Sequence, residues 1–162
     1  MKNLLIQTAE RTGLVKVEQL TSFLDQNAGQ GRLDEVLLSC PYFTEDVVLK
    51  LFAESLGWEY LSEISEKSVP QEFIESVPPM YAQHHFLIGI KSEDSNGELT
   101  VVLSRPLDAN VLDNVSKMTG MPVRPAVATR AAITAVIDVA YEQRNTVIEE
   151  VAEELDSQNL DQ

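Results

Sequence analysis

The chain has 162 residues, 44% of them hydrophobic and 23% charged, which is enough to bury the core of one compact domain or two small subdomains. Twelve basic and 26 acidic residues give a net charge of −14. Because nucleic acids and anionic membranes are bound through clustered Lys and Arg, this balance argues against both as partners. Apolar runs are shorter than the roughly 18 residues of a membrane span, so we expect no membrane insertion.

A single cysteine, Cys40, excludes a disulfide within the chain, and such sparing use of cysteine is typical of the reducing cytosol. The charge is uneven along the sequence. Residues 145–162 contain six acids and no base, which is typical of a solvated segment. We therefore expect residues 142–162 to form an acidic linker or tail.

Residues 1–61 predict a helical subdomain, because apolar side chains recur there at helical spacing. Gly13 and Gly57 stand where left-handed caps end a helix, Pro41 closes a third helix, and Thr44 is placed to cap a fourth. The apolar stripes of the four helices are Leu5, Ile6 and Ala9; Leu20, Phe23 and Leu24; Leu33, Val36 and Leu37; and Val48, Leu51, Phe52 and Leu56.

The two helix pairs of this region repeat each other at a shift of 28 residues. Gly13 then falls on Pro41, at the break between the helices of each pair. One pair alone is too small to bury its apolar face, so the two pairs are expected to pack together. The apolar matches are Leu5 with Leu33, Val15 with Phe43, Leu20 with Val48, and Leu24 with Phe52.

A polar linker at residues 62–69 precedes a region of different period, residues 70–141. Ser68 and Gln71 resemble a capping box that starts a helix with Phe73, Ile74 and Val77. Strands are expected over residues 86–91, 99–103 and 123–127, the first two joined by a turn at Asn96-Gly97. Asp108 and Thr129 are placed to cap two further helices.

The resulting order, α-β-β-α-β-α, predicts a small α/β subdomain with a three-stranded sheet, and the chain as a whole is assigned to the α+β class. Helices should outnumber strands. We expect no more than about four strands, all of them after residue 57.

Motifs for catalysis, cofactors and metals do not emerge from the sequence. The glycines form no phosphate loop, and Gly29-Gln30-Gly31 lacks the third glycine of a dinucleotide fingerprint. His84 and His85, as neighbours on a strand, would point to opposite faces and could not share a metal. Cys40 is expected to be a buried structural thiol. The acid pairs Glu45-Asp46 and Glu149-Glu150 are interpreted as helix capping and solvation, and Trp58 and Tyr60 are interpreted as core residues. We therefore expect no enzyme activity, cofactor or metal.

A series of short motifs carries a family resemblance over residues 4–141. In chain order these are Arg32-Leu33, the segment 52–57, the Val-Pro-Pro-Met-Tyr-Ala run 77–82, the segment 99–108 ending in Ser-Arg-Pro-Leu-Asp, and Thr-Gly-Met-Pro-Val at 119–123 followed by Ala128-Thr129 and Tyr141. Together they resemble the N-terminal domain of the type II secretion and type IV pilus assembly ATPases. That resemblance implies a helical subdomain followed by a small α/β subdomain.

The resemblance also implies a role. In this family the domain precedes a motor domain and docks it on the cytoplasmic face of the inner membrane, through the cytoplasmic, actin-like portion of a platform protein. We therefore expect a cytoplasmic, non-catalytic docking module that is peripheral to the inner membrane through its partner. Residues 1–61 are favoured for the contact, since paired helices offer ridges and grooves to a partner.

Two alternatives remain: a cyclic di-GMP sensor, and an unrelated adaptor that shares only the fold. Some relatives bind cyclic di-GMP through two copies of a motif that begins Arg-Leu-Gly, with a second glycine seven residues later and a terminal glutamine. The second copy here keeps Arg32 and Leu33 but has Asp34, Pro41 and Ser55 at the other positions. The first copy keeps only Gly13, with Leu4, Ile6 and Asn27 elsewhere.

We predict that neither cyclic di-GMP nor ATP binds this chain, because the motif glycines, one arginine and the phosphate loop are missing. Isothermal titration calorimetry measures this directly. A dissociation constant below roughly 10 µM, about −7 kcal/mol, would contradict the prediction.

Overall fold

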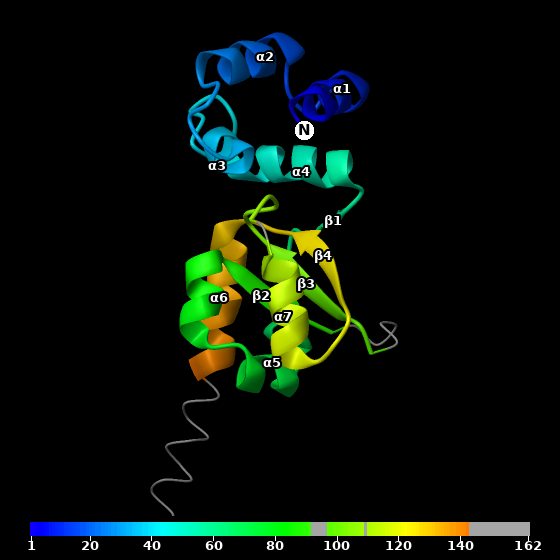
Figure 1. Ribbon diagram of the computed structural model, residues 1–162, viewed down its shortest axis with the longest axis vertical. Helices are drawn as coiled ribbons and strands as arrows, with labels where there is room; N and C mark the ends of the chain where they lie inside the picture. Colours follow the sequence, from blue (N-terminus) through cyan, green and yellow to red (C-terminus); the bar gives the residue numbers. More distant parts are fainter. Residues whose placement is uncertain (92–96, 109, 143–162) are drawn as a thin grey trace, which may run out of the picture.

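The computed structural model describes residues 1–91, 97–108 and 110–142 (Figure 1). The acidic segment from residue 143 onward and the predicted turn residue Asn96 lie outside these ranges. The elements are α1 (Lys2–Thr12), α2 (Val17–Gln26), α3 (Leu33–Leu38), α4 (Glu45–Leu56), β1 (Glu59–Tyr60), the 3₁₀ helix η1 (Glu66–Ser68), α5 (Gln71–Ser76), α6 (Pro79–His85), β2 (Leu87–Ile90), β3 (Leu99–Leu103), α7 (Val111–Thr119) and β4 (Val123–Val127). Residues 130–142 are also helical.

Helices α1 to α4, residues 1–56, form what we call the helical half. Its helices end where the sequence predicts, because Gly13 and Gly57 both adopt the left-handed conformation (φ 71°) that glycine tolerates without strain. Apolar residues of all four helices share one core, in which α1 packs on α2 and α4. The fully buried members of this core are Leu5, Leu20, Leu37 and Phe52.

Residues 57–142 form the α/β half, built on a mixed sheet of order β1-β4-β3-β2. β3 pairs antiparallel with β2 and parallel with β4, and β4 pairs parallel with β1. All five residues of β3 are buried, so both faces of this central strand are covered. Figure 1 shows α7 crossing in front of the strands, with the helical half stacked at one end of the sheet.

The class is α+β, as predicted, but the three-stranded sheet is wrong: a fourth strand, β1, joins its edge. β1 has two residues, and Leu61 extends the pairing when its N–H donates to the Val127 carbonyl (2.8 Å). Two residues are too few to show a period, so the strand escaped the sequence pattern. Among the described residues the four strands all follow residue 57, as expected.

The remaining elements agree in part with those predicted from the sequence. β3 and β4 have the predicted bounds, and Thr129 caps the last helix by accepting from the Ala132 N–H (3.3 Å). Helix α6 is not among the predicted elements; it ends at His85, shortly before β2 begins at Leu87. The proposed Ser68–Gln71 capping box is also wrong: Ser68 ends η1, and Pro70 precedes α5 without a side-chain cap.

The two halves meet at a small apolar contact. Leu49 and Ala53 of α4 are buried against Val127 of β4, with Trp58 and Tyr60 packed at the edge. In the opposite direction, Leu107 of the α/β half packs against the core of the helical half. Such limited apolar burial leaves a large role for polar contacts at this junction.

We predict that Gly89→Ala destabilises the protein by about 1–3 kcal/mol, because an added Cβ would lie 2.5 Å from Cδ2 of the buried Phe73 ring. Urea unfolding measures the loss. Phe73→Leu provides the matched test, since removing the ring edge should make the Gly89→Ala cost smaller in the double variant than in the wild type. Equal costs in both backgrounds would show that the close approach of β2 to α5 is not the cause.

Candidate functional site

A buried carboxylate, that of Asp34 at the start of α3, joins the two halves. Its side chain is fully buried and accepts three hydrogen bonds. The Arg32 Nε donates at 2.6 Å and the Glu35 N–H at 2.9 Å, both to Oδ1. The Leu107 N–H, from the α/β half, donates to Oδ2 at 2.9 Å. These donors compensate the loss of hydration that would otherwise make a buried charge costly.

The neighbouring Asp108 extends this network. Its Oδ1 lies 3.4 Å from Arg32 Nη1, and its Oδ2 lies 2.8 Å from His85 Nδ1. The predicted role of Asp108 as a helix cap is therefore wrong: α7 begins after Asn110, which has φ 72°, and Asp108 faces the junction instead.

The Arg32 guanidinium is held by three acids, Asp34, Glu35 and Asp108. Burial works to lower the pKa of Arg32, but the hydrogen bond to Asp34 and the charges of the three acids raise it above its ordinary value. Arg32 therefore stays charged and is committed to contacts within the chain.

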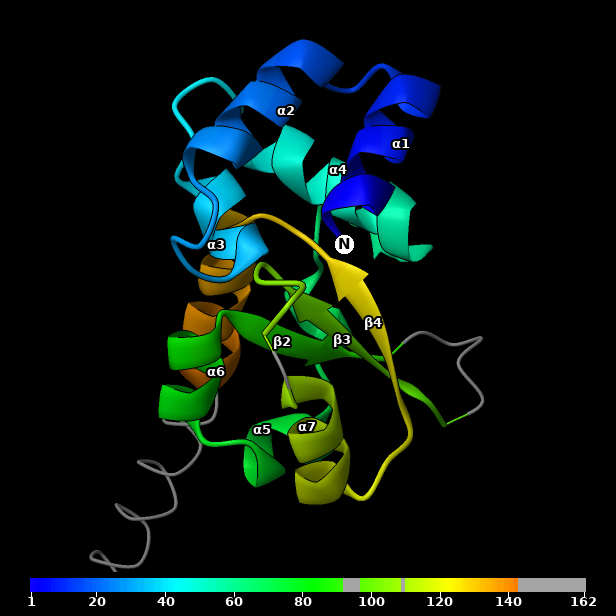
Figure 2. The same ribbon diagram turned by 45° about the horizontal axis from the view of Figure 1, so that its top comes forward.

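The segment 104–108, which follows β3, makes most of these contacts; Figure 2 shows the loop after β3 reaching α3. Leu107 supplies both an apolar side chain and an N–H, and Asp108 supplies the carboxylate for Arg32. The Arg32-Leu33 and Arg-Pro-Leu-Asp motifs, 73 residues apart, thus converge on one junction.

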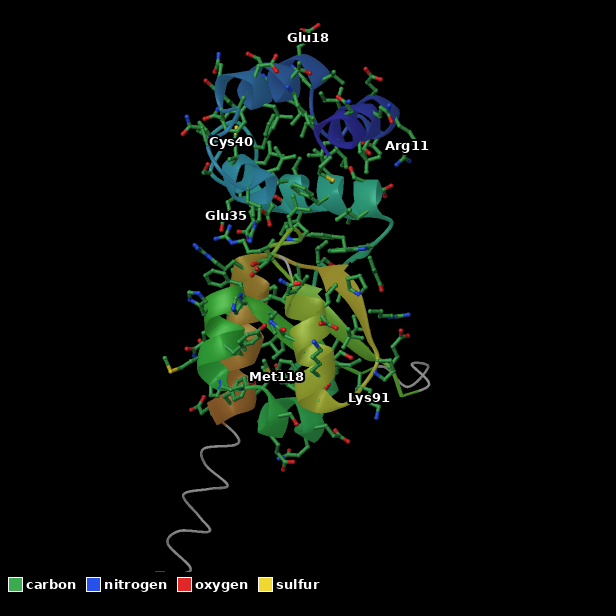
Figure 3. The ribbon with its side chains drawn as sticks, in the orientation of Figure 1. Arg11, Glu18, Glu35, Cys40, Lys91 and Met118 are labelled. Carbon is green, nitrogen blue, oxygen red and sulfur yellow. The ribbon has the colours of Figure 1, made fainter. Side chains whose placement is uncertain are left out.

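A second set of contacts borders a junction cavity of about 280 Å³. Glu45 of α4 accepts from the Arg130 N–H at the start of the last helix. The guanidinium groups of Arg105 and Arg130 both lie 5.3 Å from the centroid of the Phe86 ring. Phe86 has φ 50°, an uncommon value for a residue with a side chain. Figure 3 shows Glu35, another lining residue, pointing from α3 toward the α/β half.

The other residues weighed from the sequence are placed as follows. His84 and His85 end helix α6 rather than entering a strand, so the argument from opposite strand faces is wrong. Cys40 is a buried free thiol, as expected. Within the described ranges, no cluster of His, Cys, Asp or Glu could hold a metal. Likewise, none of the described helices is long and apolar enough to cross a bilayer.

The outward surface of the helical half carries a separate groove along α2. It has a volume of about 330 Å³. Glu18 lies at this surface and projects away from the α/β half (Figure 3). Tyr42, which follows α3, is 72% exposed and borders the groove. The inward faces of α3 and α4, by contrast, are occupied by the junction.

Sequence reasoning did not find the junction or the groove. In the sequence, Asp34 stands out only as a departure from the nucleotide motif, and the buried position of its carboxylate depends on a contact with Leu107, far along the chain. The placement of Asp34 next to Arg32, at the first turn of a helix, was the one local signal available.

The chain is similar to known proteins in both sequence and fold. The family model of the MshEN domain matches residues 56–147, more than half of the chain. Among solved structures, MshE with cdg superposes with a TM-score of 0.62 at 19% identity, covering 85% of this chain and 98% of that one. The N-terminal domain of XpsE gives 0.51 at 23% identity, covering 80% and 88%. Curated proteins give no match.

The fold is thus that of a two-part α+β N-terminal domain. The region that the family model matches, residues 56–147, is not a catalytic ATPase domain. The chain belongs to the MshEN domain family, among the N-terminal domains of type II secretion and type IV pilus ATPases, as the motifs indicated.

We predict that Asp34→Ala lowers the free energy of unfolding by about 2–3 kcal/mol, because it leaves the Leu107 and Glu35 N–H groups and the Arg32 guanidinium without their acceptor. Glu35→Gln is the matched control. That side chain is 58% exposed, so removing its ion pair with Arg32 should cost no more than about 0.5–1 kcal/mol. Denaturant unfolding measures both; equal losses would show that burial of Asp34 is not decisive.

Proposed function

We propose that this chain is a non-catalytic docking module that anchors a secretion or pilus ATPase to the cytoplasmic domain of its inner-membrane platform protein. In this role it lies in the cytoplasm, peripheral to the membrane through its partner, and a C-terminal motor domain is its second neighbour. Membership of the MshEN family supports the connection to such ATPases.

The observation that carries the proposal is that one face of the helical half contacts the α/β half and the opposite face does not. Helices α3 and α4 are turned toward the α/β half, through Asp34, Glu45 and the apolar contact of Leu49 with Val127. The outer surface of α1 and α2 is turned away from it (Figure 1). A partner can therefore bind the outer surface without opening the junction.

Residues 1–61 are accordingly the proposed contact region. Three of the four exposed large hydrophobic side chains among the described residues lie there: Met1, Leu4 and Tyr42. The fourth, Met80, lies on α6 of the α/β half. Exposed apolar side chains on a rigid helical scaffold are typical anchors of protein interfaces.

A cyclic di-GMP sensor is the second candidate, and the similarity to MshE with cdg is what favours it. The contacts of Arg32 weigh against it. This arginine, the one kept from the nucleotide motif, already binds Asp34, Glu35 and Asp108. An incoming phosphate would have to displace these carboxylates. An unrelated adaptor, the third candidate, conflicts with the family match.

The test uses the full chain and the cytoplasmic domain of an inner-membrane platform protein from the same organism. We expect saturable binding with a dissociation constant in the micromolar range or tighter, about −8 kcal/mol or better. Hydrogen exchange of the complex should show added protection within residues 1–61, with amides of α5, α7 and β2 to β4 unchanged. Absence of binding, or protection confined to the α/β half, would contradict the proposal.

A further inference from the structure

The groove on the outer surface of the helical half runs along helix α2. Glu18, Ser22 and Gln26 form one row at four-residue spacing, and Gln19 and Phe23 form the next. Tyr42, from the loop between α3 and α4, completes the lining. A groove parallel to a helix is the shape that receives a ridge of side chains from a second helix.

The groove combines two aromatic side chains with a polar border. Phe23 is half-buried and packs against the core of the helical half, so its position is fixed. Tyr42 is the one exposed residue among the Phe, Trp and Tyr side chains in the described part of the chain. Aromatic anchors surrounded by amide and hydroxyl groups are typical of the centre and rim of a protein interface.

The charge of the lining favours one kind of partner. Glu18 contributes a carboxylate, and the lining contains no Lys or Arg. Asp25, further along α2, is already paired with Lys2 at 2.6 Å. The chain as a whole has a net charge of −14, which attracts a basic partner to the molecule, and at the groove such a partner meets the carboxylate of Glu18.

We infer that this groove receives a basic amphipathic helix of the docking partner. A bulky apolar side chain of that helix packs on Phe23 and Tyr42, and an adjacent Lys or Arg pairs with Glu18. The inference rests on the proposed docking function and specifies its contact surface and the chemistry of its partner.

The first experiment measures binding of full-length variants to the cytoplasmic domain of the platform protein. Tyr42→Ala should weaken binding about thirtyfold, the effect of losing a central aromatic anchor. Met80→Ala, which removes an 80% exposed side chain from the α/β half, is the control and should leave affinity unchanged.

Glu18→Lys tests the charge contribution and should weaken binding about five- to tenfold, more at low salt than at high salt. Glu10→Lys changes the net charge by the same amount at an exposed position of α1 outside the groove, so it isolates the local effect from the global one. Circular dichroism confirms that each variant is folded.

The second experiment places a photo-crosslinking amino acid at position 42 of the full chain. We expect crosslinks to a helical segment of the partner that carries an apolar anchor and neighbouring Lys or Arg. Crosslinks to an acidic segment, or to a second copy of this chain, would overturn the inference.

The outcomes separate this inference from the docking proposal. If the wild type binds but the Tyr42 and Glu18 variants bind equally well, the groove is not the contact and docking itself stands. If the wild type does not bind the platform domain, the docking proposal fails first.

Discussion

The buried carboxylate of Asp34 is the constraint on which the arrangement of this molecule depends. It holds the Leu107 N–H from the opposite half and Arg32 from its own, and Arg32 in turn reaches Asp108. Apolar contact between the halves is limited to a few residues around Val127 and Leu107. Because hydrogen bonds are directional and apolar contacts are not, the polar network sets the angle at which the halves meet.

This junction holds the two halves together and leaves the outer surface of the helical half exposed. Asp34, at the start of α3, and Glu45, at the start of α4, both accept hydrogen bonds from backbone N–H groups of the α/β half. The outer surface of α2 takes no part in these junction contacts. Glu18 is the acid that this surface presents at the groove.

Local patterns predicted the elements whose cause is local. The alternation and apolar content of β3 and β4 and the left-handed glycines at 13 and 57 were visible in the sequence. β1 was not, since its two residues become a strand only by pairing with Ala126 and Val127. The same holds for Asp34 and Asp108, whose roles depend on Leu107 and Arg32, 73 and 76 residues away. In the sequence, an Asp that will be buried cannot be told from an Asp that will cap a helix.

The short connection between α4 and β1 has a mechanical consequence. Helix α4 has 12 residues and leads through Gly57 and Trp58 directly into the sheet edge. It therefore acts as a lever of about 18 Å fixed at one end, so that a 10° tilt at Gly57 would move its far end by roughly 3 Å. Because Gly57 and Trp58 alone separate α4 from β1, a force on the helical half is transmitted to β1 and to its partner strand β4. The hydrogen bond that Glu45 accepts at the other end of α4 resists the resulting rotation.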